Sequence, residues 1–166
     1  MSARVLLACL SAAVMGLAHA APAADLFATC PAGAPKQDLL QRPIADGFWR
    51  DGPVLAVFWS VDCAFCQRHN ARLEQLLRTA PGAAVIGIAI DERPDAVRRT
   101  VTKRGYSFPV IADDCGLRAQ LTPRKVVPMS CWLGDVPKGP RCIPGEMADE
   151  DLRDLLRQSR SSRHSW

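Results

Sequence analysis

The sequence predicts an α/β fold of three layers, in which helices flank a mixed central sheet. Short apolar runs alternate with helix-forming stretches along most of the chain. Two of these runs, residues 54–59 and 83–90, are apolar almost throughout, which is typical of strands in a sheet covered on both faces. Two later runs, separated by a turn-rich segment, indicate an antiparallel hairpin.

The expected elements follow one another in the order β-α-β-α-β-α-β-β-α. Their approximate ranges in chain order are strand 54–59, helix 64–79, strand 83–90, helix 91–104, strand 108–111, helix 113–121, strand 129–133, strand 141–143 and a final helix from residue 149. Leu73, Leu76 and Leu77 predict the inward face of the first helix, and Gly105 predicts the end of the second. Strands joined by helices are parallel, so the terminal hairpin makes the sheet mixed.

The N-terminus resembles a secretory signal peptide over residues 1–20. Arg4 precedes an apolar run from residue 5 to 17, and Ala18-His19-Ala20 matches the small-x-small cleavage pattern. The apolar run is too short for a permanent membrane-spanning helix. We therefore expect an exported protein, periplasmic or otherwise outside the cytoplasm; a lipoprotein signal around Cys9 is the alternative.

The rest of the chain predicts one domain and no repeat. We expect an N-terminal linker over 21–35, the folded domain over 36–158 and a basic C-terminal tail over 159–166. The net charge of +4 is too small and too dispersed to favour nucleic acid as a partner. No later segment is apolar enough to cross a membrane, and we expect a monomer.

The pair Cys63-Ala64-Phe65-Cys66 carries the strongest chemical signal. It lies between the strand 54–59 and the helix that follows, so the first sulfur lies at a helix N-terminus. Free backbone N–H groups and the helix dipole lower a thiol pKa at that position, which favours disulfide exchange. Disulfides persist outside the cytoplasm, and the six cysteines that follow the predicted signal peptide are an even number that could pair.

The segment from Phe58 to Cys66 resembles the active-site segment of the thioredoxin fold. Downstream, residues 88–92 and 107–113 resemble the TlpA-like branch of exported thiol–disulfide oxidoreductases. That branch carries an added β-α unit within the thioredoxin core, as 83–104 would be here. The likeness covers about 36–158 and implies a thioredoxin-like three-layer fold.

The resemblance implies a role for each matching residue. Cys63 would be the attacking thiolate and Cys66 the resolving thiol, acting through a mixed disulfide with a protein substrate. Val127-Pro128 matches the cis-proline position of the family, where the Val127 backbone would face an extended substrate; an ordinary trans proline is the alternative. Trp59 and Asp62, beside the cysteine pair, are further candidates for substrate contact.

The chain departs from the family pattern at three places. Many relatives carry tryptophan where Asp62 stands, and a carboxylate there opposes thiolate formation. Val57 occupies the position of the buried acid of thioredoxins, so that proton relay is missing; Asp62 could replace it, and an exposed loop carboxylate is the alternative. Ala64-Phe65 contains no histidine, which argues against the strongest oxidants.

The four other cysteines suggest structural disulfides. Cys131 and Cys142 lie on the two strands of the predicted hairpin, where opposed positions can come within disulfide reach. A second redox role for Cys131 is the alternative. Cys30 and Cys115 are the remaining pair, and a bond between them would attach the N-terminal segment to the core; two separate thiols are the alternative.

A metal site is the competing interpretation of the same segment. Cys63, Cys66 and His69 have a C-x2-C-x2-H spacing that could bind copper or zinc. We expect His69 to face solvent, and we expect no metal and no cofactor.

The resemblance to the TlpA-like branch therefore implies an exported reductase of specific protein partners that exchanges electrons with a membrane electron donor or acceptor, a donor in the case of a reductase. The alternatives are a non-catalytic Cu(I)-binding or protein-interaction module, or a disulfide oxidase or isomerase.

Overall fold

The computed structural model describes residues 23–91, 93–134 and 141–163. Five strands form one sheet in the order β3-β2-β1-β4-β5: β1 Val54–Trp59, β2 Val85–Ala89, β3 Val110–Ala112, β4 Met129–Leu133 and β5 Cys142–Pro144. The α-helices are α1 Ala64–Leu77, α2 Pro94–Arg104, α3 Leu117–Leu121 and α4 Asp149–Arg163. Two short 3-10 helices, Ala23–Phe27 and Asp46–Trp49, precede the first strand.

The sheet is mixed, as the sequence predicts. β1 pairs in parallel with β2, and β2 pairs in parallel with β3. On its other side β1 pairs antiparallel with β4, which pairs antiparallel with β5. The predicted order of strands and helices is confirmed, and the mixed sheet with its flanking helices forms the expected α/β fold.

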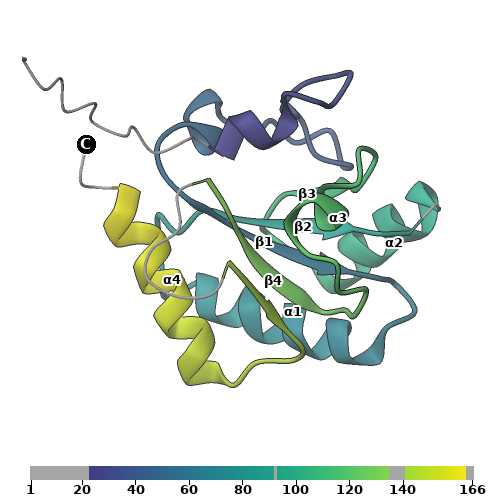
Figure 1. Cartoon of the computed structure of the whole chain (residues 1–166). Coiled ribbons are helices and arrows are strands. Elements are labelled where there is room, and N and C mark those ends of the chain that lie inside the picture. The colour runs from purple at the N-terminus through teal and green to yellow at the C-terminus, as the bar shows by residue number, and fades with distance from the viewer. Residues whose placement is uncertain (1–22, 92, 135–140, 164–166) are drawn as a thin grey trace, which may run out of the picture.

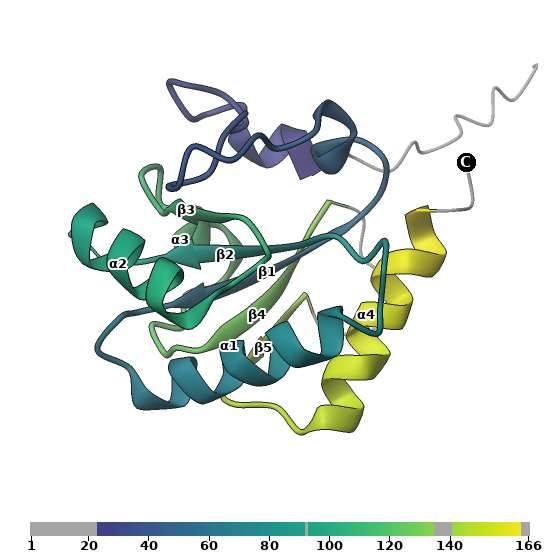
Figure 2. The same cartoon turned by 180° about the vertical axis from the view of Figure 1, so that it is seen from behind.

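Strand β1 divides the core into two halves. All six of its side chains are buried. Leu55, Val57 and Trp59 pack with residues of α1, α2 and α4, whereas the alternate side chains pack on the opposite face of the sheet. Both faces are therefore covered, which explains why this strand is apolar at every position. Figures 1 and 2 show α1 and α4 side by side below the sheet and the N-terminal segment above it.

The N-terminal segment packs on the sheet, although residues 21–35 are expected to be a linker. Ala23, Phe27 and Cys30 are buried, and the Phe27 ring meets the Trp49 ring edge-on at 4.7 Å. Helix α3 has only five residues and leaves much of this apolar face uncovered. The N-terminal segment supplies the missing cover without long regular structure.

The C-terminal tail also differs from its expected range. Helix α4 continues to Arg163, so residues 159–163 are helical. Ser159 is fully buried, and its hydroxyl accepts a hydrogen bond from the Ala84 N–H at 3.0 Å. The predicted signal peptide, the turn over 135–140 and residues 164–166 lie outside the described residues. Within the described ranges, no helix is long and apolar enough to cross a bilayer.

Candidate active site

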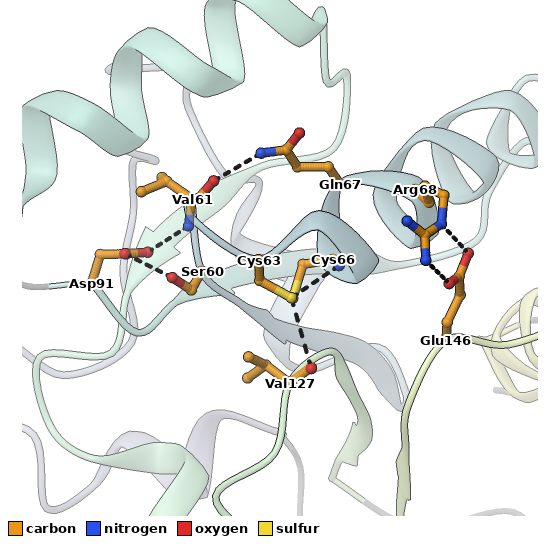
Figure 3. The surroundings of a disulfide bond; sticks show 9 residues. All are labelled: Ser60, Val61, Cys63, Cys66, Gln67, Arg68, Asp91, Val127 and Glu146. Atoms are coloured by element: carbon orange, nitrogen blue, oxygen red, sulfur yellow. Dashed lines mark hydrogen bonds and ion pairs between the residues drawn. A yellow bond between two sulfur atoms is a disulfide. The ribbon is translucent and has the colours of Figure 1, made fainter.

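Cys63 caps the N-terminus of α1. Its Sγ accepts a hydrogen bond from the Cys66 N–H at 3.1 Å, and the two cysteines form a disulfide with a Cα–Cα distance of 5.2 Å (Figure 3). Cys63 is half-buried, whereas Cys66 is fully buried. In the reduced protein, the same N–H donor and the helix dipole favour negative charge on the more accessible sulfur. The two sulfurs therefore differ in accessibility and in the support that each would have as an anion.

Asp91 holds the loop that leads to Cys63. The Ser60 hydroxyl donates to one Asp91 oxygen at 2.9 Å, and the Val61 N–H donates to the other at 3.1 Å (Figure 3). Gln67 adds a third hydrogen bond, from Nε2 to the Val61 carbonyl at 2.9 Å. Asp91 is not among the site residues expected from the sequence. Its place two residues after the buried strand β2 was the available signal, since adjacent parallel strands end at the same edge of the sheet.

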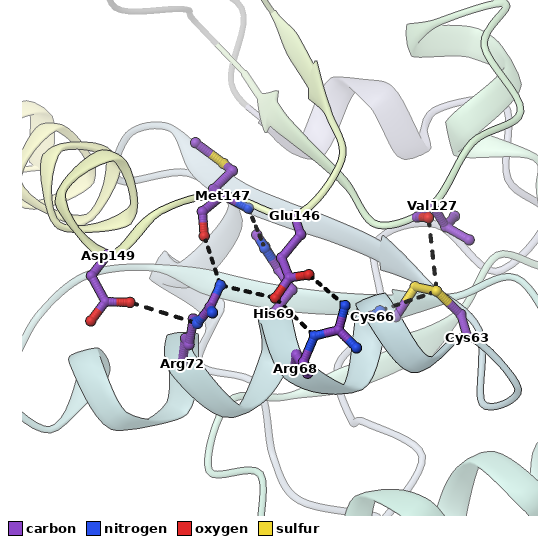
Figure 4. Close-up of polar contacts among 9 residues, drawn as sticks. All are labelled: Cys63, Cys66, Arg68, His69, Arg72, Val127, Glu146, Met147 and Asp149. Carbon is purple, nitrogen blue, oxygen red and sulfur yellow. Dashed lines mark hydrogen bonds and ion pairs between the residues drawn. A yellow bond between two sulfur atoms is a disulfide. The ribbon is translucent and has the colours of Figure 1, made fainter.

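The Val127–Pro128 peptide bond is cis. The Val127 carbonyl oxygen lies 3.8 Å from Cys63 Sγ (Figures 3 and 4). Pro128 is buried and Val127 is half-buried. The structure thus brings together the two segments that the resemblance pairs, and the alternative of a trans proline is wrong.

Asp62 and Trp59 differ in their exposure to solvent. The Asp62 carboxylate is largely exposed and pairs with Arg93 at 2.6 Å. Trp59 is fully buried, and its ring packs edge-on against Tyr106 at 6.0 Å. The expectation that Trp59 contacts substrate is wrong, because alternation along β1 directs this side chain into the core beside α1 and α2.

Two large apolar side chains near the cysteine pair remain exposed. Phe65 is 59% exposed and lies between the two cysteines, and Val126 is 52% exposed, two residues before Pro128. The Arg68 guanidinium lies 4.6 Å from the centroid of the Phe65 ring. Exposed apolar side chains on the two segments that meet at a partly accessible sulfur are suited to contact a polypeptide.

His69 is buried, so the expectation that it faces solvent is wrong. Residues 69, 73 and 76 share one helix face, because their spacing is i, i+4, i+7. The Met147 N–H donates to Nδ1 at 3.3 Å, and Nε2 lies 3.3 Å from the Ser130 hydroxyl (Figure 4). Burial lowers the pKa of His69 to about 4, opposed by the charge of Glu146 and assisted by that of Arg72.

These contacts bear on the metal interpretation. Both ring nitrogens of His69 are engaged within the protein, so neither is free to join the two cysteines as a ligand. Within the described ranges, no three His, Cys, Asp or Glu side chains gather as a metal-binding group.

Further along α1 from the cysteines, ion pairs join this helix to the loop that precedes α4. Glu146 accepts hydrogen bonds from Arg68 at 2.9 and 3.2 Å and from Arg72 at 2.9 Å (Figure 4). The hydrogen bond from Arg68 is the main cause of a lowered pKa at Glu146. Val57, which the sequence resemblance aligns with the buried acid of thioredoxins, is fully buried and lies opposite Ser130 in the β1–β4 register.

The other two cysteine pairs lie away from this site. Cys131 and Cys142 are opposed in the β4–β5 register and form a disulfide with a Cα–Cα distance of 4.1 Å. Cys30 and Cys115 form another, with a Cα–Cα distance of 5.5 Å. Cys30 and Cys131 pack in the core on one face of the sheet, whereas Cys66 packs in the core on the other. This separation favours a structural role for both bonds.

No family model and no curated protein matches the chain. Solved structures do match. A thioredoxin family thiol:disulfide interchange protein from Chlorobium tepidum has a TM-score of 0.62 at 17% identity, covering 74% of this chain and 90% of that one. A secreted thiol-disulfide isomerase from Corynebacterium glutamicum has a TM-score of 0.59 at 21% identity, covering 79% and 85%.

A third match is a secreted Mycobacterium tuberculosis disulfide oxidoreductase homologous to E. coli DsbE. It has a TM-score of 0.55 at 20% identity, covering 74% of this chain and 93% of that one. At these identities the likeness concerns the fold. The chain therefore has the thioredoxin-like fold that these thiol–disulfide oxidoreductases share.

Proposed function

We propose that the protein is an exported thiol–disulfide oxidoreductase that reduces disulfides of specific partner proteins through Cys63 and Cys66. The observation that carries the proposal is the site geometry. A half-buried sulfur at a helix N-terminus faces the Val127 carbonyl, with a buried second sulfur one turn along the helix. The similar structures support the proposal, since they are described as disulfide oxidoreductases and isomerases, two of them secreted.

The reaction begins with the Cys63 thiolate. It attacks one sulfur of a partner disulfide; that S–S bond breaks, and the departing partner thiolate takes up a proton. Cys66 then loses its proton and attacks Cys63 Sγ in the mixed disulfide. This step forms the Cys63–Cys66 disulfide and releases the second partner thiol. Two electrons have passed from the protein to its partner, and a dithiol donor, at the membrane in this proposal, must restore the reduced pair.

Substrate binding would use the surface around the sulfur. An extended segment of the partner could lie against the Val127 backbone, with Phe65 and Val126 supplying apolar contact on either side. A thiol at Cys63 could donate to the Val127 carbonyl before it ionises. Asp62 would lie at the rim of this surface, paired with Arg93.

The direction of electron flow rests on the sequence. No histidine lies between the two cysteines, and the chain resembles the reducing TlpA-like branch. The direct test is the reduction potential of the Cys63–Cys66 pair. A reductase should have a potential well below that of the strong oxidants, which is about −120 mV. A value close to about −120 mV would contradict the reductase direction and leave an oxidant.

Activity tests the general proposal. The wild-type protein should reduce insulin with dithiothreitol as donor, and Cys63→Ser should lose this activity while keeping its circular dichroism spectrum. Cys66→Ser should accumulate a mixed disulfide at Cys63, because the resolving thiol is absent. If the reduced wild-type protein instead bound Cu(I) tightly and exchanged no disulfide, a metal-binding module would replace the oxidoreductase.

A further inference from the structure

A hollow of about 340 Å³ lies beside the cysteine pair, between the active-site loop and α2. Val61 and Asp62 line it on the loop side, and the α2 side contributes the cations of Arg93, Arg99 and Lys103. Three positive side chains thus surround a space that contains one carboxylate. The hollow is therefore electropositive.

Arg93 is already engaged, since it pairs with Asp62 at 2.6 Å. Arg99 and Lys103 differ from it. Both are exposed, they lie four residues apart on α2, and neither forms an ion pair with any residue of the described ranges. Residues at this spacing share one helix face, so both cations can approach the same ligand. A single carboxylate could contact both.

The hollow is held in place relative to Cys63. Asp62 directly precedes Cys63, and its ion pair with Arg93 joins the loop to the start of α2. At the other end of α2, Arg104 donates to the Gln67 side chain, which itself donates to the Val61 carbonyl. These links hold α2 against the loop that leads to Cys63, so a molecule that reacts at this sulfur could reach the hollow with a neighbouring side chain.

We propose that this hollow binds an acidic side chain of the partner protein, close in sequence to the cysteine that Cys63 attacks. The inference rests on the proposed function and adds to it the class of substrate. Carboxylates complement Arg99 and Lys103, and the exposed Phe65 and Val126 nearby offer apolar contact to the same segment. Arg124 and Lys125, in the segment that leads to the cis proline, are also exposed.

Three disulfide peptides provide the test. They share one sequence and differ only at the two positions that flank one of the two cysteines. These two positions are both Glu, both Gln or both Lys. The rate at which the pre-reduced protein reduces each peptide is measured by stopped flow at about 20 mM and about 500 mM salt, because salt screens exposed charges. We expect the Glu peptide to react about fivefold faster than the Gln peptide at low salt, and the Lys peptide to react slowest. This preference should largely vanish at high salt.

Two pairs of substitutions locate the effect. The double variant Arg99→Gln/Lys103→Gln should bring the Glu-to-Gln rate ratio close to one. The matched control Arg78→Gln/Arg157→Gln removes the same charge from two exposed positions outside the hollow, one directly after α1 and one on α4, and should keep the ratio of the wild type.

A wild-type ratio near one, or an equal loss of preference in both double variants, would overturn the inference. Reduction of the Gln peptide would still support the proposed function in either case. If no peptide is reduced, the proposed function fails. The inference is then decided by whether the Glu peptide binds at Arg99 and Lys103. Amide NMR shifts at Arg99 and Lys103 on adding the Glu peptide, but not the Lys peptide, would support it, and their absence would overturn it.

Discussion

The Nε2 atom of His69 lies 3.3 Å from the hydroxyl oxygen of Ser130, the second residue after the cis proline. The other ring nitrogen accepts a hydrogen bond from the Met147 N–H. The proton of the neutral imidazole therefore belongs on Nε2, where it donates to Ser130. A second proton on Nδ1 would face the Met147 N–H. This buried ring joins α1 to β4 and to the loop before α4, and only its neutral form fits all of these contacts.

The first prediction is that His69 makes stability depend on pH. Its pKa is about 4 in the folded protein, against an ordinary value of 6.5 for an unfolded chain, so the unfolded state binds the proton more readily. The stabilisation is fully present above about pH 6.5 and is lost as the pH falls towards 4. The free energy of unfolding should drop by about 3 kcal/mol over this range through His69 alone.

Urea unfolding of the wild type and of His69→Gln, at pH 7 and pH 4, measures this effect. Carboxylates also titrate in this range, but they contribute to both proteins and cancel in the difference. The wild type should lose about 3 kcal/mol more than the variant between the two pH values. Equal losses in the two proteins would show that His69 does not titrate as described.

The second prediction concerns the charges beside Cys63. Asp62 is adjacent in sequence, and its carboxylate opposes ionisation of the thiol, whereas Arg93 compensates part of that charge. Asp62→Asn should therefore lower the pKa of the Cys63 thiol, and Arg93→Gln should raise it. Both groups are exposed, so each effect should be about 0.5 pH unit or less.

The pH dependence of alkylation by iodoacetamide measures this pKa in a Cys66→Ser background. Lys103→Gln provides a control for the loss of a cation from α2 that does not pair with Asp62. A pKa that rises in Asp62→Asn would contradict the assignment of opposing charges.

The helices and strands were predictable because the local sequence signals agree with the tertiary structure. Continuous apolar runs produce β1 and β2, which are buried on both faces. Gly105 ends α2 with φ of 66°, a conformation that glycine adopts readily. Cys63 could be placed at a helix N-terminus from the same boundaries.

Three features were not predicted correctly from the local sequence. A strand that is apolar throughout has no alternation to show which face Trp59 takes. The N-terminal segment has no periodic pattern, so its packing on the sheet leaves no local signal. His69 shares its helix face with Leu73 and Leu76, and this spacing was a signal of burial. It was missed because Leu77, which is only partly buried, was assigned to the same inward face.

The third prediction compares the two outer disulfides. Cys30 and Cys115 are 85 residues apart, whereas Cys131 and Cys142 are 11 apart. If cross-links act by restricting the unfolded chain, the longer loop gains more, about 4.5 against about 3 kcal/mol. Cys30→Ser/Cys115→Ser should therefore destabilise the protein more than Cys131→Ser/Cys142→Ser in urea unfolding. Both variants should retain the Cys63–Cys66 disulfide. The reverse order of stability would show that packing around the sulfurs outweighs loop length.

The last prediction concerns Tyr106, whose buried hydroxyl makes no hydrogen bond of good geometry among the described residues, although the neighbouring Asn70 side chain acts on its pKa. Burial raises the pKa of Tyr106, so the phenol stays neutral. Removing a buried hydroxyl that has no partner should cost nothing, and Tyr106→Phe should unfold with an equal or larger free energy, up to about 1 kcal/mol above the wild type.

Ser159→Ala is the matched contrast, because that buried hydroxyl accepts from the Ala84 N–H and also lies 3.3 Å from the Ala84 carbonyl. Its loss leaves a buried N–H unsatisfied and should cost about 1–3 kcal/mol. Equal destabilisation by the two variants in urea unfolding would show that the Tyr106 hydroxyl does have a partner in solution, for which the buried Asn70 side chain is the candidate.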